Sequence, residues 1–190
     1  MTPDTTSQTR LGTIEEAGDK YVLRYERHLD HPVERVWAAL TEPDQLAGWL
    51  AAADELELVE GGRIALRWLN TADKEDWKEY GVELGDHDPT TPARGKITRL
   101  DPPRLIEYET DLMGEMRWEL QADGGGCALT FTNTVELPEG YRDQTLAGWH
   151  IHLDHLAEAL AGRPIEWSTW TPDHMDEWAE IRDRYVAKPG

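Results

Sequence analysis

The sequence predicts an α+β domain in which an antiparallel sheet is covered by one long helix near the C-terminal end. Three observations carry this prediction. Residues 141–161 have the periodicity of a helix with one buried face, most of the strand-like segments come before them, and tight turns separate those segments. The element order is therefore β, α, α, several antiparallel β strands and a long α.

The long helix is expected from Tyr141 to Ala161, ending at Gly162 and Pro164. Its apolar spacing places one set of residues toward the sheet: Leu146, Trp149, His150, Leu153, Leu156, Ala157 and Leu160. A second set is expected on the other faces: Arg142, Asp143, Ile151, His155 and Glu158. Leu153 should therefore be a core residue.

The N-terminal part reads as a hairpin over 11–29, turning at Gly18, and then as two short helices. Pro32 stands at the first position of a helix that runs to Leu40, with Trp37 expected in the core. The second short helix is expected over 45–50. Further strands are expected around 55–58, 63–68, 93–100, 105–110, 116–120 and 127–137.

One segment does not fit the sheet. Asn70–Pro92 is acidic, and it is expected to be either a long loop or a loop with a strand near Glu79–Leu84. A loop of this length is usually functional or disordered, so we expect a mobile segment at a cavity entrance, with Trp77 and Tyr80 as lid contacts. The three expected parts of the chain are a disordered tail (1–10), the domain (11–162) and an extension (163–190) whose short amphipathic helix over 172–186 packs on the domain.

Composition excludes several classes of function. Thirty-eight acidic residues against nineteen basic ones give a formal net charge of -19, which disfavours binding to nucleic acid or to anionic membranes. No apolar run approaches the ~20 residues of a membrane span, and no signal-peptide core is seen. The single Cys127 rules out an internal disulfide and suits a reducing cytoplasm. A homodimer is left open.

Residues with chemical potential are few. His150, His152 and His155 cannot converge on one metal ion from a helix, so neither a metal site nor a cofactor is expected. His152 and His155 are expected to be solvated, whereas His150 borders the buried face and is the one candidate for a general acid or base. No serine or cysteine stands in a nucleophile motif.

Strand and helix phase instead predicts a cavity lined by aromatic rings. Trp49, Trp68, Trp118 and Phe131 should point inward, with Trp149 facing them from the long helix. His150 and Asn133 add polar groups, and an apolar enclosure with a few polar groups is typical of a small-molecule site. The alternative is that the rings simply fill the core.

Several stretches together resemble a known family. They are HPVERVWAALTEPDQLAGWL, GGRIALRW, GKITRLDPPRLIEYE, MRWELQADGGGCALTFTN and GWHIHLDHLAEALAG, within Tyr21–Gly162. In this order they are similar to bacterial homologues of the C-terminal domain of the activator of the 90-kDa heat-shock chaperone ATPase, in the START-like (SRPBCC, polyketide-cyclase-like) superfamily. The resemblance implies a helix-grip fold, in which a curved antiparallel sheet surrounds a long C-terminal helix and encloses an apolar cavity.

Three functions follow from the sequence. The favoured one is binding of a small hydrophobic molecule in the cavity without catalysis. The second is an enzyme of the cyclase, hydratase or hydrolase type that uses His150 as general acid or base, with Asn133 orienting the substrate. The third is a chaperone-interacting protein, by analogy with the family that gives the name. Fold alone does not choose among them.

Overall fold

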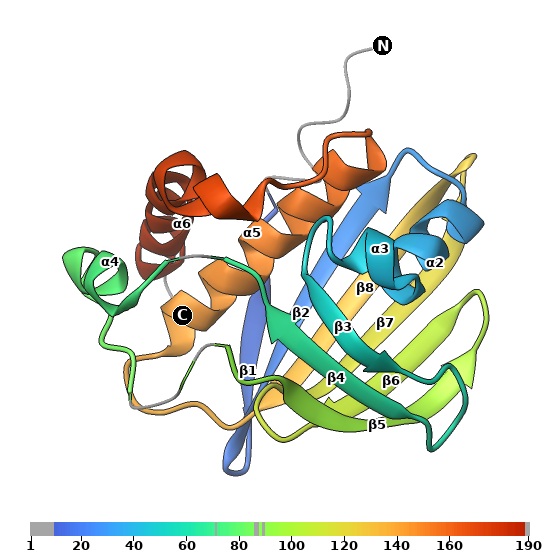
Figure 1. The fold of residues 1–190 in the computed structure, drawn as a ribbon, viewed down its shortest axis with the longest axis horizontal. Coiled ribbons are helices and arrows are strands. Elements are labelled where there is room, and N and C mark those ends of the chain that lie inside the picture. Colours follow the sequence, from blue (N-terminus) through green and yellow to red (C-terminus); the bar gives the residue numbers. More distant parts are fainter. Residues whose placement is uncertain (1–9, 71, 86–87, 89, 189–190) are drawn as a thin grey trace.

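The computed structural model describes residues 10–70, 72–85, 88 and 90–188 (Figure 1). The expected tail thus lies outside the described residues except for Arg10, which is exposed. Eight antiparallel strands form one sheet in the order β1-β2-β8-β7-β6-β5-β4-β3. The strands are β1 (Thr13–Ala17), β2 (Lys20–Leu29), β3 (Ala51–Leu56), β4 (Arg63–Trp68), β5 (Ala93–Asp101), β6 (Leu105–Thr110), β7 (Gly114–Asp123) and β8 (Gly126–Val135).

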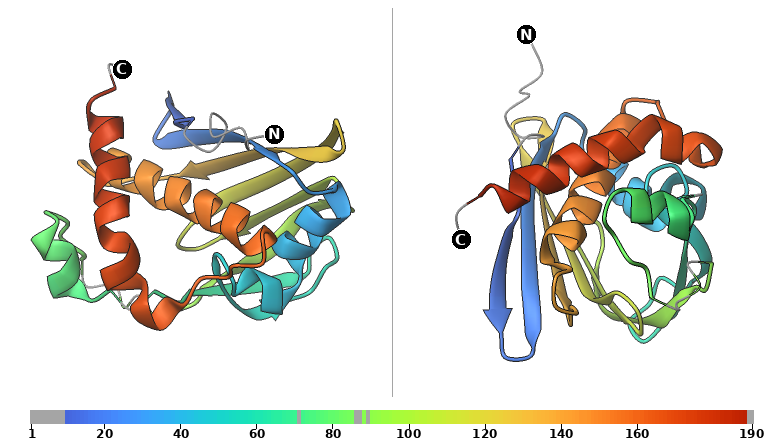
Figure 2. Two further views of the ribbon diagram at one scale, coloured as in Figure 1. Left: turned by 90° about the horizontal axis from the view of Figure 1, so that it is seen from above. Right: turned by 90° about the vertical axis from the view of Figure 1, so that its left-hand side faces the viewer.

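Two short helices follow the first hairpin and a long helix follows the last strand, and the sheet curves around this long helix (Figures 1 and 2). The helices are α2 (Val33–Thr41), α3 (Pro43–Leu46), α4 (Lys74–Glu79), α5 (Arg142–Leu160), the 3₁₀ turn η1 (Trp167–Thr169) and α6 (Trp170–Val186). The two short helices after the first hairpin and the long helix are confirmed. The second short helix was expected over 45–50 and is found over Pro43–Leu46, because Pro43 occupies the first turn, where proline favours the start of a helix.

Alternation along the strands sorts side chains onto two faces of the sheet. Tyr25, Trp118 and Phe131 point inward from β2, β7 and β8 and are at most 1% exposed. On the outer face Arg117 forms ion pairs with Glu107 at 2.7 Å and with Glu119 at 2.9 Å. The expected division into an apolar and a solvated face is therefore correct.

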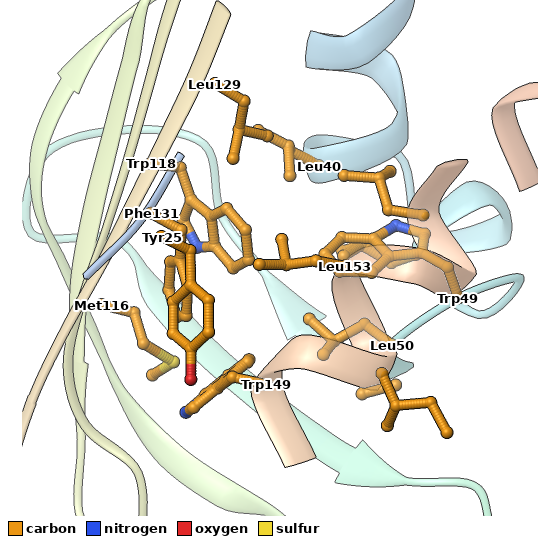
Figure 3. Close-up of a cluster of buried hydrophobic side chains, with 14 of the residues drawn as sticks. Tyr25, Leu40, Trp49, Leu50, Met116, Trp118, Leu129, Phe131, Trp149 and Leu153 are labelled. Atoms are coloured by element: carbon orange, nitrogen blue, oxygen red, sulfur yellow. The ribbon is translucent and has the colours of Figure 1, made fainter. Parts of the chain in front are cut away.

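The aromatic side chains at the centre form a closed core (Figure 3). The rings of Trp118 and Phe131 stack with centroids 3.9 Å apart, and Trp49 meets Trp118 edge-on at 5.6 Å. Leu153 from α5 is 1% exposed among them, as predicted. The prediction for Trp37 is wrong in degree, since its ring is only partly buried at the edge of this core.

Helix α5 is buried on more sides than its pattern predicted. Ile151 and His155, expected on the outer faces, are 1% and 2% exposed. The reason is α6, which packs against α5 on a flank away from the sheet (Figure 2). Trp170 of α6 donates a hydrogen bond from Nε1 to Nε2 of His155 at 3.1 Å.

The segment between β4 and β5 was predicted as a loop or a strand, and it contains the short helix α4 instead. The Asp73 side chain caps this helix by accepting hydrogen bonds from the backbone N–H groups of Glu75 and Asp76. In turn, the Asp76 carboxylate accepts a hydrogen bond from the backbone N–H of Asp73. Trp77 of α4 meets Trp178 of α6 edge-on at 4.9 Å. The segment is thereby attached to α6.

Candidate functional site

A cavity of about 560 Å³ lies between the N-terminal half of α5, the end of β8 and the segment that carries α4. Leu112, Glu136 and Pro138 are exposed at its mouth, whereas Asn133, Trp149 and His152 are buried at its inner end. Trp68 of β4 and Trp178 of α6 also line the cavity. Further lining residues come from α5 and from the α4 segment, and they include Asn70, Trp77, Val82, Leu84, Tyr141, Gln144 and Gly148.

One face of α5 supplies the longest wall. Tyr141, Gln144, Gly148 and His152 recur at the spacing of one helical turn, and they line the cavity together. Gly148 lies at the middle of this wall, and a Cβ atom placed on it would meet no atom within 4 Å. Glycine inside a helix destabilises it by roughly 0.5–1 kcal/mol relative to alanine. This position therefore leaves space over the helix at a cost to its stability.

Aromatic rings make up much of the remaining lining. Trp68 of β4 meets Trp149 of α5 at 6.1 Å between centroids, with the rings inclined by 63°. Trp77 and Trp178 form a second pair on the side of α4 and α6. The Tyr141 hydroxyl donates a hydrogen bond to the carbonyl of Glu83, which attaches the end of the α4 segment to α5.

Asn133 is inward-facing, as predicted, and its hydrogen bonds hold the cavity wall in place. Its Nδ2 donates to the carbonyl oxygens of Met113 at 2.8 Å and Glu115 at 3.0 Å. Its Oδ1 accepts from Nε1 of Trp149 at 3.0 Å. Asn133 therefore orients the Trp149 ring.

His152 and His155 were expected in solvent, and this expectation is wrong. His152 is 7% exposed and stacks on Trp68 with centroids 5.1 Å apart. Desolvation lowers the pKa of His152 to about 4, and it also lowers the pKa of His155. Both rings are therefore neutral at pH 7, and His152 places a neutral imidazole in the cavity wall.

His150 is buried outside the cavity. Its Nδ1 lies 2.8 Å from the Tyr185 hydroxyl of α6, and that hydroxyl also accepts a hydrogen bond from the Gly12 N–H at 2.8 Å. Its Nε2 lies 3.6 Å from Oδ2 of Asp154, whose pKa is raised to about 7, chiefly by desolvation. His150 thus joins α5 to α6 and to the chain before β1.

The structure brings together three of the residues expected at the site and separates the others. Trp68, Asn133 and Trp149 line the cavity. Trp49, Trp118 and Phe131 point inward as expected, but they do not line the cavity: Trp118 packs against both Trp49 and Phe131 in the core, and Phe131 lies 4.6 Å from Trp149 between centroids. Sequence reasoning missed the lining residues Gly148, His152 and Trp178, whereas Trp77 was expected at the cavity entrance and does line the cavity. The one-turn spacing of Gly148 and His152 was the available signal for two of them.

Within the described part of the chain, no three His, Cys, Asp or Glu side chains gather in a way that could hold a metal ion. No helix in the same residues is long and apolar enough to cross a membrane.

Comparison with solved structures shows the same fold in bacterial proteins. The chain is similar to CalU16 from Micromonospora echinospora (TM-score 0.61, 21% identity, 94% of this chain and 95% of that chain covered). It is also similar to EF2215 of Enterococcus faecalis (TM-score 0.59, 17% identity, 93% and 95% covered). The protein encoded by BPP1335 of Bordetella parapertussis gives a TM-score of 0.59 at 26% identity, with 96% and 94% covered. The helix-grip fold is thereby confirmed.

Curated protein sequences gave no match. The sequence model described as "Activator of Hsp90 ATPase homolog 1-like protein" matches residues 30–161, which contain α2, most of the sheet and all of α5. These elements supply most of the cavity wall, while α6 lies beyond the match. The chain therefore belongs to the Activator of Hsp90 ATPase homolog 1-like family.

Proposed function

We propose that this protein binds a small, largely apolar molecule in the cavity beside α5, and that binding requires no catalysis. The observation that carries the proposal is the open space of about 560 Å³ over Gly148, inside a protein whose central core is closely packed. Protein interiors are normally filled, so an aromatic-lined space beside a helical glycine is best explained by a ligand.

The size and lining of the cavity agree with this class of ligand. Small-molecule pockets commonly measure about 300–1,000 Å³ and combine apolar walls with a few polar groups. Here the walls come from Trp68, Trp77, Trp149 and Trp178. Glu136 at the mouth and the net charge of -19 favour a neutral or cationic ligand over an anionic one.

The enzymatic alternative has less support. The residue it depended on, His150, does not line the cavity, and its ring is engaged with Tyr185 and Asp154. Asn133, proposed to orient a substrate, is engaged with Trp149 and two backbone carbonyls. General acid–base catalysis requires a titrating group within reach of the substrate, and neither side chain provides one.

The test is a titration with the neutral fluorescent probe N-phenyl-1-naphthylamine. Wild-type protein and Gly148→Ala should both bind it saturably, because a single methyl group leaves most of the space open. Gly148→Leu should bind it at least about tenfold more weakly, because its side chain occupies the space. A denaturant melt of each variant checks that the fold is intact. Absence of saturable binding to the folded wild type, or equal binding to Gly148→Leu, would refute the proposal.

A further inference from the structure

His152 presents two ring nitrogens with different roles. Its Nδ1 lies 3.0 Å from the backbone carbonyl oxygen of Trp49. A carbonyl oxygen can only accept a hydrogen bond, so Nδ1 must carry the proton. In a neutral imidazole the other nitrogen, Nε2, is then a bare acceptor. The lowered pKa of His152 agrees with the neutral form.

Nothing in the described part of the chain donates to this acceptor. The hydrogen bond to Trp49 is the one that the His152 side chain makes there. Two neighbouring indole N–H groups are engaged elsewhere, since Trp149 donates to Asn133 and Trp167 donates to the carbonyl of Ala47 at 2.6 Å. Because His152 lines the cavity, this acceptor is available to a water molecule or a ligand there.

The surrounding rings hold the imidazole in this orientation. Trp68 stacks on it at 26° between the ring planes, and the rings of Trp149, His155 and Trp167 lie 5.9–6.3 Å from it between centroids. His152 is 7% exposed and lines the cavity, so the part of the ring that remains accessible faces the site of the proposed ligand. The acceptor is therefore preorganised, and binding need not order it.

We propose that the ligand donates a hydrogen bond to Nε2 of His152, which makes hydroxylated aromatic or polycyclic molecules the preferred class. This inference rests on the proposed function, because it names the chemistry of a molecule in the same cavity. The aromatic part would contact Trp68 and Trp149, and the hydroxyl would reach the imidazole at the inner end.

Three matched probes test the inference: naphthalene, 2-naphthol and 2-methoxynaphthalene. They share one ring system, but only 2-naphthol has a donor. We expect 2-naphthol to bind the wild type about 3- to 10-fold more tightly than 2-methoxynaphthalene, the range of one neutral hydrogen bond. Simple partition into an apolar space would favour the methoxy compound instead, because it buries an additional methyl group.

Two further measurements connect the preference to His152. In His152→Phe the preference should disappear while naphthalene still binds, whereas in His31→Phe, the same change at a histidine outside the cavity lining, it should persist. In wild-type protein with ¹⁵N-labelled histidine, 2-naphthol should shift the Nε2 resonance of His152 and 2-methoxynaphthalene should not. This readout needs no variant.

The outcomes separate this inference from the proposed function. Equal binding of all three probes to the wild type would overturn the inference and leave the apolar cavity supported. A naphthol preference that survives in His152→Phe would also overturn it. If none of the probes binds to folded wild-type protein, the proposed function falls as well.

Discussion

Replacing Gly148 by alanine should stabilise the protein, which is unusual for a substitution at a proposed binding site. Gly148 lies inside α5, more than a turn from either end, and a Cβ atom there meets nothing within 4 Å. The gain is the helix preference of alanine over glycine, roughly 0.5–1 kcal/mol, with no steric loss to offset it. For a chain of this length that corresponds to a rise in melting temperature of about 1–4 °C.

Gly162→Ala is the matched control. This glycine also has no atom within 4 Å of a built Cβ, but its φ of 84° lies in the left-handed region at the end of α5. Alanine there should destabilise by about 1 kcal/mol, because an L-residue is strained in that conformation. Guanidinium melts should show midpoints that move in opposite directions at unchanged slope. A destabilised Gly148→Ala would mean that this face of α5 is closed, and the cavity argument would fail.

Three other perturbations follow from the same contacts. Leu153→Ala removes a fully buried side chain and should cost about 2–5 kcal/mol in a denaturant melt, so an unchanged midpoint would contradict the core assignment. Proteases should cut within Asn70–Pro92 early, and they should cut it less readily when a probe fills the cavity. Equal cleavage rates with and without the probe would show that this segment takes no part in binding. Burial lowers the pKa of His152 from 6.5 to about 4, so between these pH values the unfolded state binds a proton that the folded state does not. This residue therefore makes the unfolding free energy rise by about 3 kcal/mol between pH 4 and 6.5. Asp154 makes the unfolding free energy fall over pH 4–7, because its pKa is raised from 3.8 to about 7 and the folded state therefore binds the extra proton. When the unfolding free energy is measured against pH, the curve should be flatter in His152→Phe and steeper in Asp154→Asn than in wild type. Parallel curves would refute both assignments.

The sheet and α5 were predicted well from the sequence because strands and helices have local patterns of apolar residues. Alternation along β7 and β8 placed Trp118 and Phe131 on the inner face, and the structure confirms that face. Phase says which way a ring points, but not whether another ring closes over it. Trp118 and Phe131 stack on each other, whereas Trp149 borders open space, and that difference depends on contacts between strands and helix that no single segment encodes.

The errors on α5 come from packing partners that helical periodicity does not show, among them Trp68 of β4, which stacks on His152. His152 and His155 were assigned to solvent because they lie off the apolar stripe of the helix. The chain after Gly162 returns and covers that side with Trp167 and Trp170, whose rings contact the histidines. Helical periodicity describes one packing partner, and α5 has two. The capping pair Asp73 and Asp76, in contrast, was a readable signal for α4 that the acidic composition of the segment obscured.

The cavity combines residues from both sides of the point where the family match ends. Residues 30–161 supply Trp68, Trp149 and His152, whereas Trp178 comes from α6 beyond that boundary. Trp178 also packs against Trp77 of α4, so α6 helps to position the cavity wall that α4 supplies. The shape of the cavity therefore depends on the fit of α6 against α4 and α5 as well as on the shared fold. Family membership fixes the frame of the site, and the identity of the proposed ligand would depend on these added contacts as well.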